Sequence, residues 1–266
     1  MYCRHVKLVS NERISETYYR IGFECREIAE KARPGQFLMV RVLEPAWEHM
    51  LSRPFSFCEV SGDRIELLFN VVGKGTRSLS ETRVGSSLEV IGPLGKGFSS
   101  EDVSRAILVG GGMGIAPLPF LASELTKRGR AAMMTVLLGA RTASSLCLQD
   151  SFTDLGAEVR VATDDGTAGH RGPVTDLLGE SLKGASDSGR VVYACGPEPM
   201  LRTVARLTRE RGVRCELSVE ERMACGVGAC MSCACETRDE HGGVHYQRVC
   251  TEGPVFNAAE LLFDED

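Results

Sequence analysis

Four cysteines near the end of the chain constrain the fold most, because their side chains must meet in space if they bind a common group. They follow the spacing C-x4-C-x2-C and then a gap of sixteen residues: Cys225, Cys230, Cys233 and Cys250. This spacing is typical of a plant-type [2Fe–2S] cluster, in which four thiolates hold two irons. Gly226 and Gly228 allow the backbone to wrap closely around such a cluster and to direct amide N–H groups at its sulfurs. The sequence therefore predicts a carrier of single electrons.

A structural zinc site is the alternative for these cysteines. Zinc sites usually combine two C-x2-C pairs or include histidines, and this chain has only one such pair. Cys235 follows Cys233 by two residues, but its use as a ligand would break the C-x2-C spacing, so we expect a bystander. His241 and His245 lie before the fourth cysteine. A Rieske-type centre would need two histidines on one iron, and four cysteines already complete the ligand set.

Composition and charge exclude several functional classes. Of the 266 residues 43% are hydrophobic and 25% are charged, the formal net charge is −5, and no basic run indicates a nucleic-acid partner. The sequence has no apolar run of about 18 residues, which a membrane span would need. The N-terminus also lacks the apolar core of a signal peptide, so we expect a cytoplasmic protein. In that compartment eleven cysteines indicate metal or redox chemistry. Five scattered cysteines are expected to be small buried hydrophobic residues: Cys3, Cys25, Cys58, Cys147 and Cys215.

The hydrophobic pattern divides the chain into three predicted domains. Short apolar strands at 36–42, 55–60, 64–72 and 87–92 are separated by Gly and Pro, which predicts an antiparallel β-barrel or sandwich. Strands at 106–109, 133–140, 158–163 and 190–196 alternate with helical segments, which predicts βαβ units and a parallel sheet. We therefore expect an α+β multidomain fold, with a β-barrel at 1–100, an α/β nucleotide-binding domain at 101–213 and a cluster module at 214–266.

Two motifs in the barrel region suit a diphosphate. Arg53-Pro54-Phe55-Ser56 opens a strand, and Asn70-Val71-Val72 leads through a glycine-rich turn to Gly75 and Thr76. Singly they fit an edge-strand start and a hairpin loop, although the turn also presents N–H groups at a helix N-terminus. Together they resemble the flavin site of the ferredoxin–NADP reductase superfamily. The resemblance implies that Arg53 pairs with the FAD diphosphate, that Ser56 and residues 70–72 approach the isoalloxazine, and that Gly75 and Thr76 lie at the phosphates.

A second glycine-rich loop follows the strand at 106–109. Gly110-Gly111-Gly112-Met113-Gly114 precedes a helix, as a dinucleotide loop does, but the last glycine position of G-x-G-x-x-G holds Ile115. Its Ala-Pro ending resembles the NAD(P) loop of the same superfamily, and so does Cys195-Gly196-Pro197 at a strand end. The resemblance implies that Cys195 lies near the nicotinamide; a strand-end cysteine without a role is the alternative. Arg141 leaves NAD and NADP open, and His170 is expected to be a loop histidine because hydride transfer needs orientation more than proton chemistry.

The order of the motifs along the whole chain sharpens this resemblance. R-P-F-S, G-x-G-T, G-G-G-x-G-x-A-P-L, C-G-P-x-x-M, M-A-C-G-x-G-A-C-x-x-C and V-C-x-x-G-P-V-F look like the electron-transfer subunit family of NAD-dependent (class 1B) dihydroorotate dehydrogenase. The resemblance implies a separate FMN-containing catalytic subunit that oxidises dihydroorotate in pyrimidine synthesis. It also implies electron flow through the [2Fe–2S] cluster and FAD to NAD⁺, in a heterotetramer of two plus two subunits. No catalytic acid or base is expected on this chain.

Two other functions stay open on the sequence. The same cofactors would serve another NAD(P)H-linked complex, namely a sulfide dehydrogenase, transhydrogenase, sulfite reductase or hydrogenase. Some transhydrogenase relatives use an aspartate as one cluster ligand, whereas this chain has cysteine at all four positions. A zinc-stapled binding module is the non-enzymatic alternative. It would be colourless, whereas a protein with FAD and a [2Fe–2S] cluster is brown.

Overall fold

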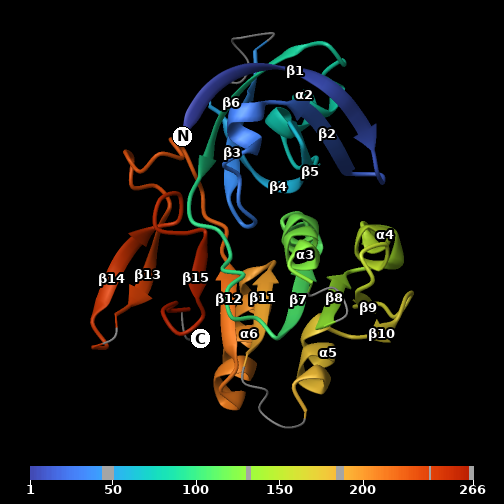
Figure 1. Ribbon diagram of the computed structural model, residues 1–266, viewed down its shortest axis with the longest axis vertical. Helices are drawn as coiled ribbons and strands as arrows, with labels where there is room; N and C mark the ends of the chain where they lie inside the picture. The colour runs from blue at the N-terminus through green and yellow to red at the C-terminus, as the bar shows by residue number, and fades with distance from the viewer. Residues whose placement is uncertain (44–50, 130–132, 184–188, 240, 264–266) are drawn as a thin grey trace.

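The first hundred residues form a closed antiparallel barrel in the computed structural model, which describes residues 1–43, 51–129, 133–183, 189–239 and 241–263 (Figure 1). The strands follow one another around the barrel in the order β1 (Tyr2–Arg13), β2 (Tyr18–Glu24), β5 (Arg64–Asn70), β4 (Arg53–Ser61), β3 (Phe37–Val42) and β6 (Ser87–Leu94). Pairing of β6 with β1 closes the ring. The expected N-terminal barrel is confirmed.

The barrel is filled by alternating side chains. Buried and half-buried positions alternate along the whole of β6, because every second side chain of a strand faces the same side. Phe57 and Phe69 are buried in the same core. Two short helices, α1 (Arg26–Ala29) and α2 (Lys74–Glu81), interrupt the strands. The sequence did not predict β1, because only Val6 and Leu8 of this strand are buried and its other side chains are exposed or half-buried.

The middle of the chain forms a second sheet, which is parallel except at one edge. Its order is β10 (His170–Arg171), β9 (Glu158–Thr163), β8 (Met134–Ala140), β7 (Arg105–Gly111), β11 (Arg190–Cys195), β12 (Arg214–Ser218) and β15 (Val255–Asn257). Helices α3 (Leu118–Lys127) and α4 (Gln149–Thr153) pack in the core that reaches the barrel, and α5 (Val174–Ser181) and α6 (Glu198–Arg211) in the core on the other face. Alternate residues of β7 enter these two cores. The expected parallel-sheet domain is confirmed.

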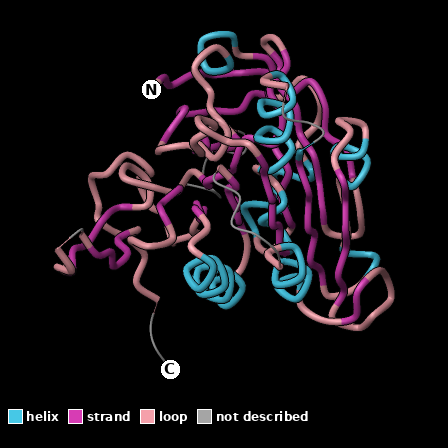
Figure 2. The backbone as a smooth tube through the Cα atoms, turned by 60° about the horizontal axis from the view of Figure 1, so that its bottom comes forward, coloured by secondary structure: helices cyan, strands magenta, loops and turns pink. Residues whose placement is uncertain are grey.

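The cysteine-rich segment leaves the sheet after β12 and returns to it at β15, which pairs antiparallel with β12. Between them lies the hairpin of β13 (Ala234–Arg238) and β14 (Val244–Arg248), which projects from one side of the molecule in both backbone views (Figure 2). The expected domain limits stay predictions, and the sheet includes β12 and β15 from beyond residue 213. In the described ranges, no helix is long and apolar enough to cross a membrane.

Candidate functional site

A cleft of about 370 Å³ opens where the barrel, the sheet and the cysteine-rich segment meet. Several residues that the sequence singled out line it: Arg53, Pro54, Phe55, Ser56, Asn70, Val72, Thr76, Met113 and Cys195. Phe37, Phe69 and Pro254 add apolar wall. The cleft therefore gathers the two barrel motifs, the glycine-rich loop of the sheet and the end of β11 around one space.

Arg53 provides the positive charge at the barrel side of the cleft. It is the first residue of β4, and its Nη1 donates to the Leu51 carbonyl at 2.6 Å. A Cβ on Gly75 would lie 3.1 Å from Arg53 Nε, so the glycine leaves room for the guanidinium across the start of α2. Thr76 Oγ1 accepts from the amides of Val72 and Gly73 at 3.0 and 3.2 Å, which caps this helix. Guanidinium and helix N-terminus together suit a diphosphate.

One buried polar atom in the cleft lacks a partner within the described chain. Asn70 Oδ1 is buried and makes no hydrogen bond there, although buried polar groups are normally paired. Phe37 and Phe55 provide aromatic wall in the same cleft. The unpaired amide oxygen of Asn70, the aromatic walls and the positive charge of Arg53 fit an FAD molecule. Val71 does not line the cleft and packs against the barrel core.

The glycine-rich loop is held against the end of β11 by close backbone contacts. It continues from β7 into a single 3-10 turn, η1 (Gly112–Ile115), where Gly112 has φ +53°. A Cβ on Gly114 would lie 2.5 Å from Gly196 Cα and would contact the Cys195 carbonyl group. A Cβ on Gly111 would lie 3.1 Å from the Pro197 ring. These glycines therefore bring the two predicted NAD elements together by packing, and the members of these elements that line the cleft are Met113, Ala116, Pro117 and Cys195.

Gly196 and Pro197 line a neighbouring groove of about 460 Å³ together with Glu220 and Cys235. Cys195 itself is buried, and burial raises the pKa of its thiol to about 12. A neutral, buried thiol is a poor nucleophile. Its position at the carboxyl end of a strand suits contact with a bound nucleotide, which in open α/β sheets binds outside these strand ends.

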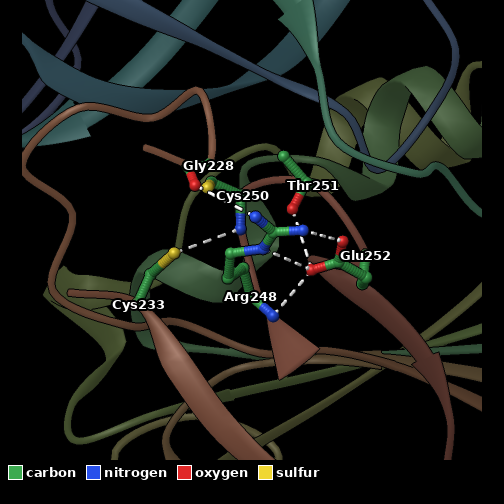
Figure 3. Close-up of polar contacts among 6 residues, drawn as sticks. All are labelled: Gly228, Cys233, Arg248, Cys250, Thr251 and Glu252. Carbon is green, nitrogen blue, oxygen red and sulfur yellow. Dashed lines mark hydrogen bonds and ion pairs between the residues drawn. The ribbon is translucent and has the colours of Figure 1, made fainter. Parts of the chain in front are cut away.

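The four predicted cluster ligands form two pairs. Cys225 lies within hydrogen-bond reach of Cys230, and Cys250 within reach of Cys233. The Cys250 amide donates to Cys233 Sγ at 3.4 Å (Figure 3), and the Val227 amide donates to Cys225 Sγ at 3.4 Å. Although desolvation opposes it, amide and thiol hydrogen bonds lower the pKa of Cys225 to about 6. Two thiol pairs suit a cluster of two irons that each take two thiolates.

Two glycines let the first ligand loop pack closely. Gly226 has φ +69° and lies against Met39 of β3, where a Cβ would come 2.5 Å from Cγ. Gly228 has φ +83° and lies against Thr251, with a Cβ 2.8 Å from Cγ2. Positive φ favours glycine because it lacks a Cβ. In the part of the chain that the structure describes, no three His, Cys, Asp or Glu side chains are close enough to surround a single metal ion.

The cleft and the cysteines share one wall. Phe37 lines the cleft, and with Met39 it packs in a small core that contains Cys233 and Cys250. Cys233 and Cys250 are buried on this inner side, whereas Cys230 is exposed. The arrangement places the Cys233–Cys250 pair behind the wall that Phe37 gives to the cleft.

The sequence reasoning missed the lining contributed by the segment after β12. The cleft is lined by Ser218, the last residue of β12, and by four residues of the segment that follows: Val219, Glu220, Glu221 and Met223. Glu220 is exposed at the mouth of the cleft, yet desolvation by the surrounding protein raises the pKa of its carboxyl. The topology could have indicated these residues, because the segment follows the carboxyl end of a sheet strand, where ligands bind in open α/β sheets.

The remaining cysteines and histidines are explained by burial and local pairing. Cys25, Cys58, Cys147 and Cys215 are buried as expected, but Cys3 is exposed; that expectation was wrong because Cys3 lies on an outward position of β1. Burial raises the pKa of Cys235, a half-buried residue of β13, to about 11. His170 and His245 form local pairs with Asp176 and Asp239 at 2.9 and 2.7 Å.

Two family models match the chain. Residues 220–262 match the iron-sulfur cluster binding domain of dihydroorotate dehydrogenase B, and residues 108–206 match an oxidoreductase NAD-binding domain. Curated relatives named "Dihydroorotate dehydrogenase B (NAD(+)), electron transfer subunit" are similar over nearly their whole length. The relative from Caldanaerobacter subterraneus is 40% identical over 257 residues, 97% of each chain, and that from Geobacillus kaustophilus is 40% identical over 260 residues, 96% of each chain.

Solved structures share the fold. An NADH-dependent reduced ferredoxin–NADP oxidoreductase, solved for its flavin-based electron bifurcation, has a TM-score of 0.82 and 29% identity over 96% of this chain and 88% of that chain. The cytochrome b5 reductase domain of Ulva prolifera nitrate reductase has a TM-score of 0.66 and 17% identity over 79% and 93% of the two chains, a likeness of fold alone. FAD, a [2Fe–2S] cluster and NAD are the cofactors that these matches support. With its barrel, sheet and paired cysteines, the chain belongs to the family of the electron-transfer subunits of dihydroorotate dehydrogenase B (NAD⁺).

Proposed function

We propose that this chain receives electrons from an FMN-containing catalytic subunit that oxidises dihydroorotate, and that it delivers them to NAD⁺ in pyrimidine biosynthesis. A [2Fe–2S] cluster takes up single electrons, whereas FAD exchanges either single electrons or a hydride, so together they join a one-electron donor to a two-electron acceptor. The protein's task is to hold both groups, and the nicotinamide, in fixed order.

The observation that carries this proposal is the shared wall of cleft and cysteines. Phe37 and Pro254 line the cleft, and Phe37 packs in one core with Cys233 and Cys250. A flavin in the cleft and a cluster on the cysteines would therefore be separated by a single layer of side chains. Met113 and Cys195 line the same cleft and provide the approach for the nicotinamide.

We assign roles to the residues as follows. Arg53 and Thr76 bind the FAD diphosphate with the backbone at Gly75, and Ser56 with Asn70 and Val72 faces the isoalloxazine. The loop 111–114 and the segment 195–197 bind NAD⁺. The cluster ligands are Cys225, Cys230, Cys233 and Cys250. No side chain is assigned as a catalytic acid or base, because hydride transfer between nicotinamide and flavin needs orientation.

The partner would dock on the exposed side of the first ligand loop. Cys230 is exposed there, and the apolar side chains of Val227 and Met231 in the same loop expose 40% and 53% of their surface. An apolar exposed patch marks an interaction surface. We propose a complex of two such chains with two catalytic subunits, located in the cytoplasm.

Anaerobic affinity purification of the tagged chain from native extract tests this function. We expect a co-purifying FMN protein and NAD⁺ reduction that depends on dihydroorotate. A brown complex with a different partner, inert toward dihydroorotate, would overturn the substrate assignment in favour of another NAD(P)H-linked complex. A colourless protein that contains zinc would overturn the cofactor assignment as well.

A further inference from the structure

Arg248 connects the two segments that supply the cluster ligands. It is the last residue of β14 and lies two residues before Cys250. Its Nη1 donates to the carbonyl oxygen of Gly228 at 3.0 Å, across twenty residues of chain (Figure 3). Gly228 belongs to the loop between Cys225 and Cys230, so one side chain joins the first ligand loop to the turn that carries the fourth ligand.

The guanidinium is fixed from its other side by Glu252. Arg248 Nη2 and Nε donate to the two carboxylate oxygens at 2.8 and 3.1 Å, and the Arg248 amide donates to Oε2 at 2.8 Å (Figure 3). Thr251 Oγ1 donates to the same carboxylate at 2.8 Å. A bidentate Arg–carboxylate pair has a defined orientation as well as strength. Glu252 therefore holds Arg248 in the position from which it reaches Gly228.

The backbone of the turn is closed on the same residue. The amides of Thr251 and Glu252 donate to the Arg248 carbonyl at 3.1 and 2.9 Å. Cys250 lies inside this turn, and its amide points at Cys233 Sγ. The side chains of Arg248 and Glu252 are 35% and 30% exposed, so water screens their charges only in part.

The charges of this pair act on the cluster with opposite signs. A cluster held by four thiolates is anionic and gains one more negative charge on reduction. A positive charge nearby favours the reduced state and a negative charge favours the oxidised state. Arg248 and Glu252 flank Cys250 in sequence and form one ion pair, so removal of either charge leaves the other uncompensated beside the cysteines.

We propose that Arg248 is a positioning residue of the cluster, which ties the Cys225–Cys230 loop to the Cys250 turn and, balanced by Glu252, sets the reduction potential. The proposal rests on the assignment of the [2Fe–2S] cluster to the four cysteines. It adds a determinant of electron transfer that touches neither flavin nor nucleotide.

Reduction potentials of the purified holoprotein, measured by anaerobic titration with EPR detection, test the proposal. Arg248→Gln should favour the oxidised cluster by about tenfold, a potential lower by about 59 mV for one electron, because Glu252 is left uncompensated. Glu252→Gln should shift the potential upward, because Arg248 is left uncompensated. Arg248→Lys keeps the charge but not the fork of donors, so its potential should stay near the original value while its EPR spectrum changes.

Arg206→Gln is the matched control, because Arg206 pairs with Glu210 with the same i,i+4 spacing on α6, away from the cysteines. It should leave the potential unchanged. Shifts of equal sign in the Arg248→Gln and Glu252→Gln variants, or shifts no larger than in the control, would overturn the proposal. Loss of iron from Arg248→Gln with FAD retained would support the positioning role. Absence of iron from the unmodified holoprotein would instead refute the cluster assignment itself.

Discussion

Replacement of Gly114 by alanine tests whether the glycine-rich loop must touch the end of β11. A Cβ at this position would lie 2.5 Å from Gly196 Cα and closer still to the Cys195 carbonyl, whereas ordinary contact begins at 3.4 Å. All three nearest atoms belong to the backbone, so no side chain can rotate away. The η1 turn would have to move from β11 by about 1 Å, in an interior that is close-packed.

The displacement should affect stability moderately and nucleotide use strongly. Overpacking of this kind costs about 1–3 kcal/mol, which should lower the urea midpoint of the Gly114→Ala variant. A misplacement of about 1 Å in a binding element reduces turnover by about 100-fold. We expect a loss of this order in kcat/KM for NADH-dependent dye reduction. FAD and iron contents should be unchanged, because the atoms nearest to the added Cβ belong to Cys195 and Gly196 and not to the barrel motifs or the four cluster cysteines.

Gly179→Ala is the matched control. Gly179 lies inside α5, where a Cβ would meet no atom within 4 Å, so alanine should stabilise the helix by about 0.5–1 kcal/mol and leave the kinetics unchanged. Normal NADH kinetics in the Gly114→Ala variant would refute the assignment of this loop to the nucleotide. Loss of FAD together with activity would show that the loop holds the flavin cleft together instead.

Three further predictions concern the cofactors and the pH dependence of stability. Cys230→Ser should abolish electron delivery to the partner but preserve NADH-dependent dye reduction, whereas Cys235→Ser should preserve both; equal loss of dye reduction with FAD still bound would contradict the order of the cofactors. Arg53→Ala should release FAD, seen as a lower ratio of flavin to protein absorbance, and an unchanged ratio would disprove its contact with the diphosphate. Desolvation raises the pKa of the Glu220 carboxyl above 4.5, so the folded protein keeps a proton that the unfolded chain has already lost. The free energy of unfolding therefore falls as the pH rises from the unfolded to the folded pKa of this group. Glu220→Gln should remove that fall in pH-dependent urea unfolding, and a parallel pH profile for both proteins would argue against it.

The fold was largely predictable from local pattern. Strands β3 to β9 and β11, and the βαβ alternation, follow from hydrophobic runs punctuated by Gly and Pro. β1 and β2 were not predicted. The alternation along β1 brings only Val6 and Leu8 to buried positions, and β2 mixes buried and half-buried positions without a period of two. The antiparallel return of β15 to β12 depends on contacts across more than thirty residues, which no local pattern indicates.

The candidate site likewise contains residues that local motifs indicated and residues that only the tertiary structure brings in. Motifs with fixed spacing, such as the four cysteines and the Arg53 strand, indicated their chemistry because the spacing itself is the geometric requirement. The contribution of Glu220 and its neighbours to the cleft could not be predicted, because it depends on where β12 ends relative to the barrel. The fork of Arg248 between Gly228 and Glu252 is likewise a product of tertiary packing.

The antiparallel pairing of β15 with β12 has a consequence for motion and for evolution. Both ends of the cysteine-rich segment emerge from adjacent strands at one edge of the sheet, and the Val219 amide donates to the Pro254 carbonyl at 2.9 Å where they part. The cysteine-rich segment is thus attached to the sheet at both of its ends, so it cannot rotate as a unit about a single hinge. Because β12 and β15 are paired neighbours, a short turn between them could replace the whole segment. A segment attached in this way can be gained or lost while the barrel and the parallel sheet stay the same.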